Sequence, residues 1–201
     1  NLDMARMAAI LAGNCDMTFT DCAADCGTYF VLMHCVNGWQ EEVADVTVTG
    51  GTIRTKKEAF LVKSHNALID LKEVDIASEA GVLVRTIVND DPCATKVTEP
   101  PYGVNVRMTG MSVSGDLLHE DATRDMWVEL KSTTLTGAIK GANLSMDPGS
   151  KWPATDDSDV TLLTSVDPAQ IDAPAGVTVT VQGVEAAEYT LAGGGRLVVE
   201  A

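Results

Sequence analysis

Aromatic side chains and positive charge are both scarce in this sequence. Phe, Trp and Tyr together make up 4% of the residues, so Val, Leu, Ile, Ala and Met must fill the core. The 14 Lys and Arg residues face 29 Asp and Glu residues, which gives a formal net charge of −15. Such a charge repels phosphate backbones and anionic lipid headgroups. We therefore expect no sequence-specific binding of nucleic acid and no docking to a membrane.

Long hydrophobic runs are also missing. No stretch approaches the roughly 18 apolar residues that a membrane-spanning helix needs, which excludes an integral membrane protein of the helical kind. The segment 4–13 has some features of a signal peptide, but its apolar part is short and Asp3 is unfavourable in the preceding region. We instead predict an amphipathic helix near the N-terminus, over residues 2–12, that ends at Gly13.

Signatures of catalysis are absent. The sequence has no Gly-x-Ser-x-Gly, no phosphate-binding loop with Lys and no His-Glu-x-x-His. Its three histidines, His34, His65 and His119, are widely separated. A hydrolase would need His65 or His119 to meet a carboxylate or a thiol in a cleft. We expect a protein that is not an enzyme, with no cofactor.

Short apolar or alternating segments bounded by turn residues predict a mainly β protein with one or two short helices, built as a β-sandwich or a barrel-like body. The clearest strands are 43–48, 82–88 and 102–113, and the last 40 or so residues predict an antiparallel β-meander with a tight reversal at Gly193-Gly194-Gly195. Segment 117–130 fits a helix or a strand equally well. No fixed repeat is visible.

This pattern predicts three regions. Residues 1–140 form a β-rich main body that includes the N-terminal helix. Residues 141–158 form a loop or linker, because they are rich in Gly, Pro, Ser and Asp. Residues 159–201 form the C-terminal meander, either as a separate lobe or as part of the same domain.

Four of the five cysteines lie near the N-terminus. Their spacing, even with His34, does not match a familiar zinc site. In an oxidising compartment they are candidates for disulfides, whereas in a reducing one they would pack as small apolar side chains. Cys93 is then the unpaired residue. The disulfide candidates are Cys15, Cys22, Cys26 and Cys35.

Two acidic clusters are candidate sites for a metal or for catalysis. His119-Glu120-Asp121 with Asp125 offers metal ligands or an acid–base pair, but consecutive residues do not converge on one point, so a solvated charged face is favoured. The run 156–159 resembles a calcium loop, yet lacks the glycine and the final glutamate of an EF-hand. We expect no metal at either place.

Two features favour self-assembly. The N-terminal segment carries a stripe of apolar side chains, and one basic cluster stands out in the acidic chain. Either could contact an identical subunit, although a solvated loop explains the basic cluster as well. The predicted interface residues are Leu2, Met4, Met7, Leu11, Arg54, Lys56, Lys57 and Lys63.

Residues 177–199, read VTVTVQGVEAAEYTLAGGGRLVV, resemble the β-meander of many bacteriophage virion proteins. There, a valine-rich strand is followed by Gly-Val, Tyr-Thr, Gly-Gly and another strand. This resemblance covers about a fifth of the chain. It implies a structural subunit of a virion that contacts identical subunits and other virion proteins.

Within a virion, we expect a tail-tube protein whose acidic surface would line a channel for DNA. The alternatives are a capsid decoration or cement protein, and a secreted, extracellular fibre or adhesion module with disulfides.

Overall fold

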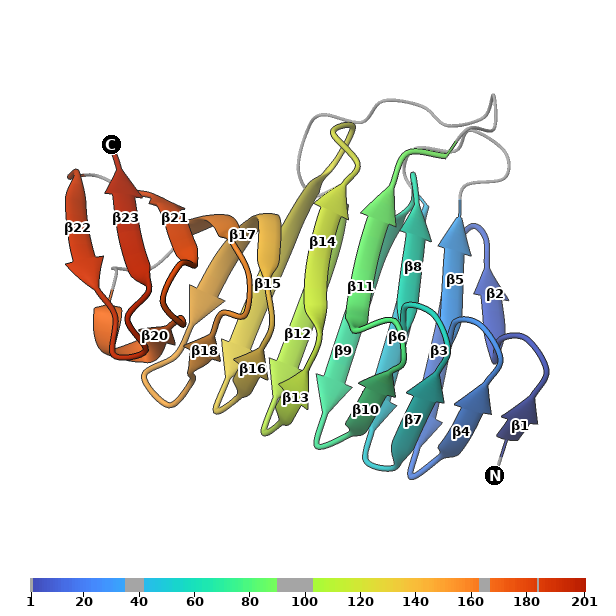
Figure 1. Cartoon of the computed structure of the whole chain (residues 1–201). Coiled ribbons are helices and arrows are strands. Elements are labelled where there is room, and N and C mark those ends of the chain that lie inside the picture. The colour runs from blue at the N-terminus through green and yellow to red at the C-terminus, as the bar shows by residue number, and fades with distance from the viewer. Residues whose placement is uncertain (1, 35–41, 90–102, 163–166, 184) are drawn as a thin grey trace.

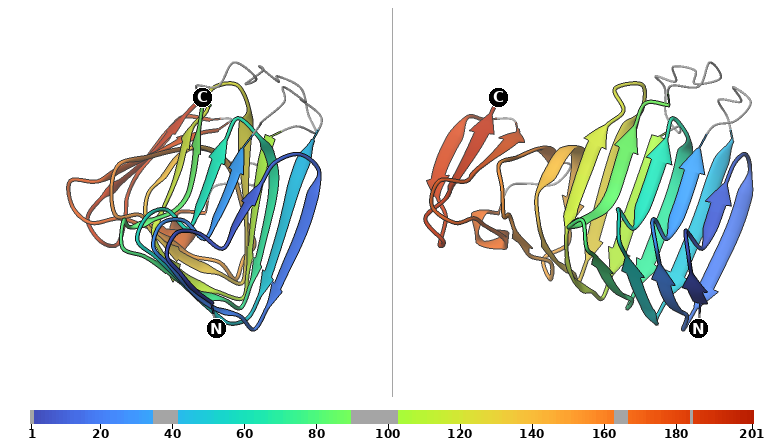
Figure 2. Two further views of the ribbon diagram at one scale, coloured as in Figure 1. Left: turned by 90° about the vertical axis from the view of Figure 1, so that its right-hand side faces the viewer. Right: turned by 45° about the vertical axis from the view of Figure 1, so that its right-hand side comes forward.

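A computed structural model describes residues 2–34, 42–89, 103–162, 167–183 and 185–201, apart from the side chains of residues 2 and 3. The chain winds into a parallel β-solenoid, in which successive coils stack along one axis and the two termini lie at opposite ends (Figure 1). Viewed down this axis, the cross-section is roughly triangular (Figure 2). Each of the first coils contributes one strand to each of three faces.

The first face begins with four strands, which pair in parallel. Shorter strand pairs continue this line towards the C-terminus. The four strands are β1 (Leu2–Met4), β4 (Ala23–Cys26), β7 (Thr52–Thr55) and β10 (Asp75–Ser78); the pairs are β13 (Ser112–Ser114) with β16 (Thr134–Thr136), and β18 (Trp152–Pro153) with β20 (Ile171–Asp172).

The second and third faces also consist of parallel strands, apart from one antiparallel pair at the C-terminal end of the third face. The second face contains β2 (Ala9–Leu11), β5 (Val31–His34), β8 (Phe60–Lys63), β11 (Val82–Ile87) and β14 (Asp116–Glu120). The third face contains β3 (Cys15–Thr20), β6 (Val43–Thr49), β9 (Asn66–Lys72), β12 (Gly103–Thr109) and β15 (Asp125–Lys131), and continues with β19 (Ser158–Leu162), β21 (Thr178–Gln182), β23 (Arg196–Glu200) and β22 (Ala187–Thr190).

Strand β17 (Ile139–Met146) belongs to both of these faces. Its first residues pair with β14, and residues 143–146 pair with β15. Between the two, Gly141 has φ of +73°, a left-handed conformation that glycine adopts without a steric penalty. This glycine lets one strand turn the corner between two faces.

The core lies inside the solenoid, because side chains alternate between the interior and the surface along each strand. The parallel register stacks inward-facing residues of successive coils directly on one another. One such row runs through Val46, Ile69, Val106 and Val128, all of which are buried. The core is therefore a column of aliphatic layers, as the scarcity of aromatic residues predicted.

The corner after the third face is also repeated from coil to coil. Asp21, Gly50, Glu73, Gly110 and Ser132 each follow a third-face strand, and each has φ between +47° and +66°. The amide of each of the first four donates to the carbonyl that ends the next third-face strand. A stacked series of left-handed turns thus sets the direction in which every coil bends.

The mainly β prediction is confirmed, and the sheet closes around a core. The helix predicted over 2–12 is wrong, because this segment forms β1 and β2. Its apolar residues are spaced for a helix, but strand pairing with β4 and β5 prevails over local propensity. The single helix among the described residues is the short 3-10 turn η1 (Pro168–Gln170).

Three other segments form strands whose assignment or pairing the sequence alone did not establish. Segment 117–130 is not a helix but contributes β14 and β15. Residues 141–146, expected in a linker, belong to β17, and the sheet runs on through β19. The C-terminal meander is antiparallel only between β22 and β23, which the predicted glycine turn joins, while β19, β21 and β23 pair in parallel.

Candidate functional site

The first coil leaves its core partly open. The inward side chains of Met4, Cys15, Met17 and Phe19 pack against the hydrophobic core, but all four are only partly buried. Strands β1, β2 and β3 each pair with a neighbour on one side within the described chain. The N-terminal end of the solenoid therefore combines free strand edges with half-exposed apolar side chains.

The corresponding side chains of the second coil are fully buried. Its residues in register with the four are Cys26, Ala44, Val46 and Val48, and each is at most 1% exposed. The difference does not come from polarity, since both coils present apolar side chains at these positions. It comes from position, because within the described residues the first coil has a neighbouring coil on one side and the second coil has one on both sides.

The C-terminal end is closed instead. In the last parallel strands, Val179, Val181 and Leu197 have no exposed surface. Strand β23 pairs on both edges, with β21 and with the antiparallel β22, and Leu191 is buried in the turn between β22 and β23. The outermost strand, β22, is short and carries charge, which discourages further pairing.

A second feature is a groove of about 580 Å³ on the outer surface of the third face. It crosses β9, β12, β15 and β17, and Leu68, Asn105 and Trp127 are among the residues that line it. These three side chains occupy successive positions of one outward row, which Asn143 continues. The groove thus runs along the solenoid, across the strands.

Trp127 occupies the centre of this row and is half-buried. Its ring lies over Gly103 on the neighbouring strand, since a Cβ added at Gly103 would come within 2.3 Å of the ring atom Cζ3. The amide of Gly103 donates to Oδ1 of the buried Asn66 at 3.1 Å. A glycine is therefore required beneath the ring, and the hydrogen bond fixes the backbone there.

The polar groups of the groove are close to neutral as a set. Arg107 and Glu129 sit side by side, with Nε and Oε2 3.7 Å apart. Asn143, which follows Trp127 in the row but does not line the groove, donates from its amide to the carbonyl of Met126 at 3.3 Å. Among the described residues, neither the Asn105 amide nor the Trp127 indole N–H has a protein hydrogen-bond partner. Donors and acceptors therefore remain available beside an aromatic ring.

The two histidines considered for catalysis are engaged in structural contacts. Nε2 of His65 accepts from the Gly13 amide at 3.0 Å, and Nδ1 lies 2.7 Å from the Asn66 carbonyl, to which it donates. Burial, followed by the charge of Arg124, lowers the pKa of His65, although the Asn66 contact opposes this shift. His65 is thus a neutral core residue whose two ring nitrogens are both used in structural hydrogen bonds.

His119 bridges two neighbouring elements. Its Nδ1 lies 2.5 Å from the Thr86 hydroxyl, and its Nε2 lies 2.9 Å from the carbonyl of Arg124. Among the described residues, no carboxylate or thiol is hydrogen-bonded to either nitrogen. This geometry does not assemble the acid–base pair that a hydrolase would need.

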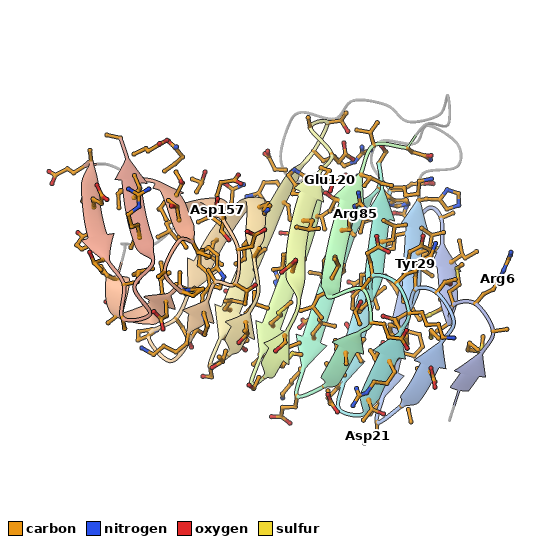
Figure 3. All side chains as sticks on the ribbon, viewed as in Figure 1. Arg6, Asp21, Tyr29, Arg85, Glu120 and Asp157 are labelled. Atoms are coloured by element: carbon orange, nitrogen blue, oxygen red, sulfur yellow. The ribbon has the colours of Figure 1, made fainter. Side chains whose placement is uncertain are left out.

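The acidic residues near His119 separate. Asp121 is buried with Arg124, their closest charged atoms 3.5 Å apart, and its carboxylate also accepts from the Thr123 amide. Glu120 points to the outer surface and pairs with Arg85 of β11 at 2.8 Å (Figure 3). The exposed Asp125 begins β15. The residues that are adjacent in sequence therefore form two separate ion pairs: Asp121 with Arg124 in the interior, and Glu120 with Arg85 on the surface.

The acidic run 156–159 caps backbone amides. Asp156 accepts from the amide of Asp157, Asp157 from that of Thr178, and Asp159 from that of Gly141. The described residues contain no cluster of three or more His, Cys, Asp or Glu side chains placed to hold a metal ion. These carboxylates fasten neighbouring coils to one another.

Three of the four disulfide candidates are described, and all three are free thiols. Cys15 and Cys22 are partly exposed, and Cys26 is buried. Burial raises the pKa of the Cys26 thiol. Cys35 lies outside the described residues, as does Cys93, so pairing that involves Cys35 stays a prediction.

The predicted interface residues divide into two groups. Met4 and Met7 are half-buried on the first coil, Leu11 is buried at 4% exposure, and the side chain of Leu2 lies outside the description.

The basic residues lie elsewhere, on β7, on β8 and in the turn between them. There, Arg54 pairs with Asp75, Lys57 lies 5.4 Å from the centre of the Tyr29 ring, Lys56 is exposed and Lys63 ends β8.

Comparison with protein-family models, curated proteins and solved structures found no match for this chain. Within the described part of the chain, no helix is long and apolar enough to cross a membrane. The open first coil and the groove are therefore the two features of the molecule that bear on its function.

Proposed function

We propose that this chain is a non-enzymatic structural subunit that assembles with an identical subunit through its first coil. The observation that supports this is the half-exposed inner row of β3, whose counterparts one coil further are fully buried. Covering this row would transfer apolar surface from water, which is favourable in proportion to its area. Free strand edges beside it supply backbone donors and acceptors for pairing.

The edge of β3 suits pairing with its own copy. In an antiparallel pair centred on Met17, the inner residues Cys15 and Phe19 of the two copies face each other, and Asp16 faces Thr18. Inner side chains stay inside and no two acidic residues oppose each other directly. Residues 2–20 contain two acidic residues and one basic residue, so this end adds little repulsion to the assembly.

Contact through the first coil joins subunits along the solenoid axis and makes a longer rod. This favours a fibre-like component, either of a bacteriophage virion, as the C-terminal resemblance indicates, or of an extracellular fibre. A tail-tube protein would need in addition a lateral contact that closes a ring. In that setting the basic residues of β7 and β8 are the candidates for lateral contact, as they would be on a capsid decoration protein.

The test is the mass of the purified chain by light scattering across concentration. We expect a dimer that dissociates on dilution, and a monomer for Met17→Glu, because this change places a charge in the contact. Tyr189→Glu, on the exposed strand β22 at the closed end, is the matched control and should dimerise normally. A wild-type chain that is monomeric at every concentration would contradict the proposal.

Cross-linking tests the register. In the variant Met17→Cys, the two introduced thiols would face each other across the symmetry axis, within the reach of a disulfide. Non-reducing peptide mapping should then show a link between the two copies at this position. A dimer whose introduced thiols never cross-link would exclude this pairing of β3.

A further inference from the structure

We infer that the groove around Trp127 is a binding site for a neutral oligosaccharide. This inference is independent of the proposed assembly, because the groove lies on the outer surface of the third face and not on the first coil. Its volume of about 580 Å³ is within the range of small-molecule sites. It is also elongated across strands whose polar side chains repeat from coil to coil.

The chemistry of the central row matches a sugar chain. The half-buried indole ring of Trp127 offers a flat apolar face with an N–H at its edge, and the amides of Asn105 and Asn143 flank it on the adjacent strands. A pyranose presents an apolar face of C–H groups and a rim of hydroxyls. Stacking on the ring would therefore leave these hydroxyls beside amides that can both donate and accept.

The spacing supports the same ligand. Neighbouring strands lie about 4.8 Å apart, which is close to the length of one sugar ring in an extended chain. Asn105, Trp127 and Asn143 thus present one polar or aromatic group for each successive sugar. An extended peptide is less suitable, because the backbone groups of these strands already pair within the sheet and are not available for strand addition.

Charge indicates a neutral sugar. Glu129 lies 3.7 Å from Arg107 and 2.8 Å from Lys131, so its carboxylate partly neutralises both cations. Asp45 and Asp70 lie on the same outer face, and the chain as a whole carries −15. The acidic surroundings would therefore disfavour an anionic polysaccharide relative to a neutral one.

Titration calorimetry with neutral hexasaccharides of glucose, xylose and mannose in extended linkages tests the inference, with hexagalacturonate as the anionic comparison. We expect at least one neutral hexasaccharide to bind. Trp127→Ala should weaken this binding about tenfold or more, and Asn105→Ala should weaken it to a smaller extent. The control Tyr189→Ala removes an exposed aromatic ring from β22 and should leave the affinity unchanged.

Three results would overturn the inference: no binding of any neutral hexasaccharide, unchanged binding by a correctly folded Trp127→Ala variant, or preference for hexagalacturonate. Asn105→Ala keeps the ring and its packing on Gly103, so it tests the site even if the tryptophan variant is unstable. The monomeric Met17→Glu variant should bind the sugar as the wild type does. A failure of assembly is thereby distinguished from a failure of sugar binding.

Discussion

Met17 of β3 and Val46 of β6 occupy the same register position inside the solenoid, yet Val46 is fully buried and Met17 is not. The difference in burial between these two residues shows that the core is partly open at the first coil. The hydrophobic effect acts on area removed from water, so a side chain at the open end contributes less to the stability of a single subunit than its counterpart inside.

A matched pair of methionine truncations tests this difference. Met108→Ala, at a fully buried position of β12, should lower the free energy of unfolding by about 2–5 kcal/mol. Met17→Ala should cost less than half as much when measured by urea denaturation under dilute, monomeric conditions. Equal losses would mean that the first coil is covered in solution.

Gly103→Ala should destabilise the protein and disturb the groove. The added Cβ would lie 2.5 Å from the carbonyl oxygen of Asp125 and would displace the ring of Trp127. We expect a loss of about 2 kcal/mol or more, together with a shift in tryptophan fluorescence. Gly81→Ala is the control: it also has positive φ, +72°, but an added Cβ meets no atom within 4 Å, so it should lose about 1 kcal/mol.

The ion pair between Asp121 and Arg124 is buried, so replacing its carboxylate by an amide should lower the free energy of unfolding strongly. Asp121→Asn removes one charge from a pair whose two side chains are each 2% exposed, which should cost about 3 kcal/mol in chemical denaturation. Glu188→Gln breaks the pair with Arg196, whose two side chains are each 60% exposed, and should cost less than about 1 kcal/mol. Similar losses in the two variants would contradict this explanation.

His65 predicts a loss of stability in mild acid. Its pKa is lowered in the folded chain, so between that pKa and the ordinary value of 6.5 the unfolded chain binds more protons. Stability therefore falls as the pH drops below about 6.5, since a protonated Nε2 can no longer accept from the Gly13 amide. His65→Gln should show a smaller loss between about pH 7.5 and about pH 5.5 in urea titrations. Identical pH profiles would refute the assignment.

The cysteines should differ in reactivity. Alkylation of the native chain should modify Cys15 and Cys22 well before Cys26, because Cys26 is buried and its pKa is raised, so little of the reactive thiolate forms. Peptide mapping after timed quenching would give the order of modification. The same mapping without reductant would show whether Cys35 forms a disulfide, as the sequence allows. Fast modification of Cys26 would indicate that β4 opens in the native state.

Individual strands could be predicted from the sequence because alternation and turn residues are local signals. The segments expected at 43–48 and 82–88 correspond to β6 and β11, and the Gly193–Gly195 reversal joins β22 to β23. The solenoid could not be predicted in this way. Register partners are 23 residues apart between Ala44 and Ala67 but 37 apart between Ala67 and Val104, so no period appears.

The candidate site was visible only in part. Met4 and Met7 were predicted from the apolar stripe of an N-terminal helix; that helix does not form, but both residues are half-buried on the first coil. The groove was missed, because Asn105, Trp127 and Asn143 are 22 and 16 residues apart and come together only through parallel pairing. One local signal was available: Gly103 is the first residue of a strand of alternating residues, where a glycine indicates close approach of another group.

The difference between the two ends has a consequence for unfolding. Each coil of a solenoid is stabilised mainly by its neighbours, and the first described coil has its hydrophobic row open on one side. The last described parallel strands instead bury Val179, Val181 and Leu197 completely. Thermal or chemical unfolding should therefore begin at the first coil and spread along the axis towards the sealed end.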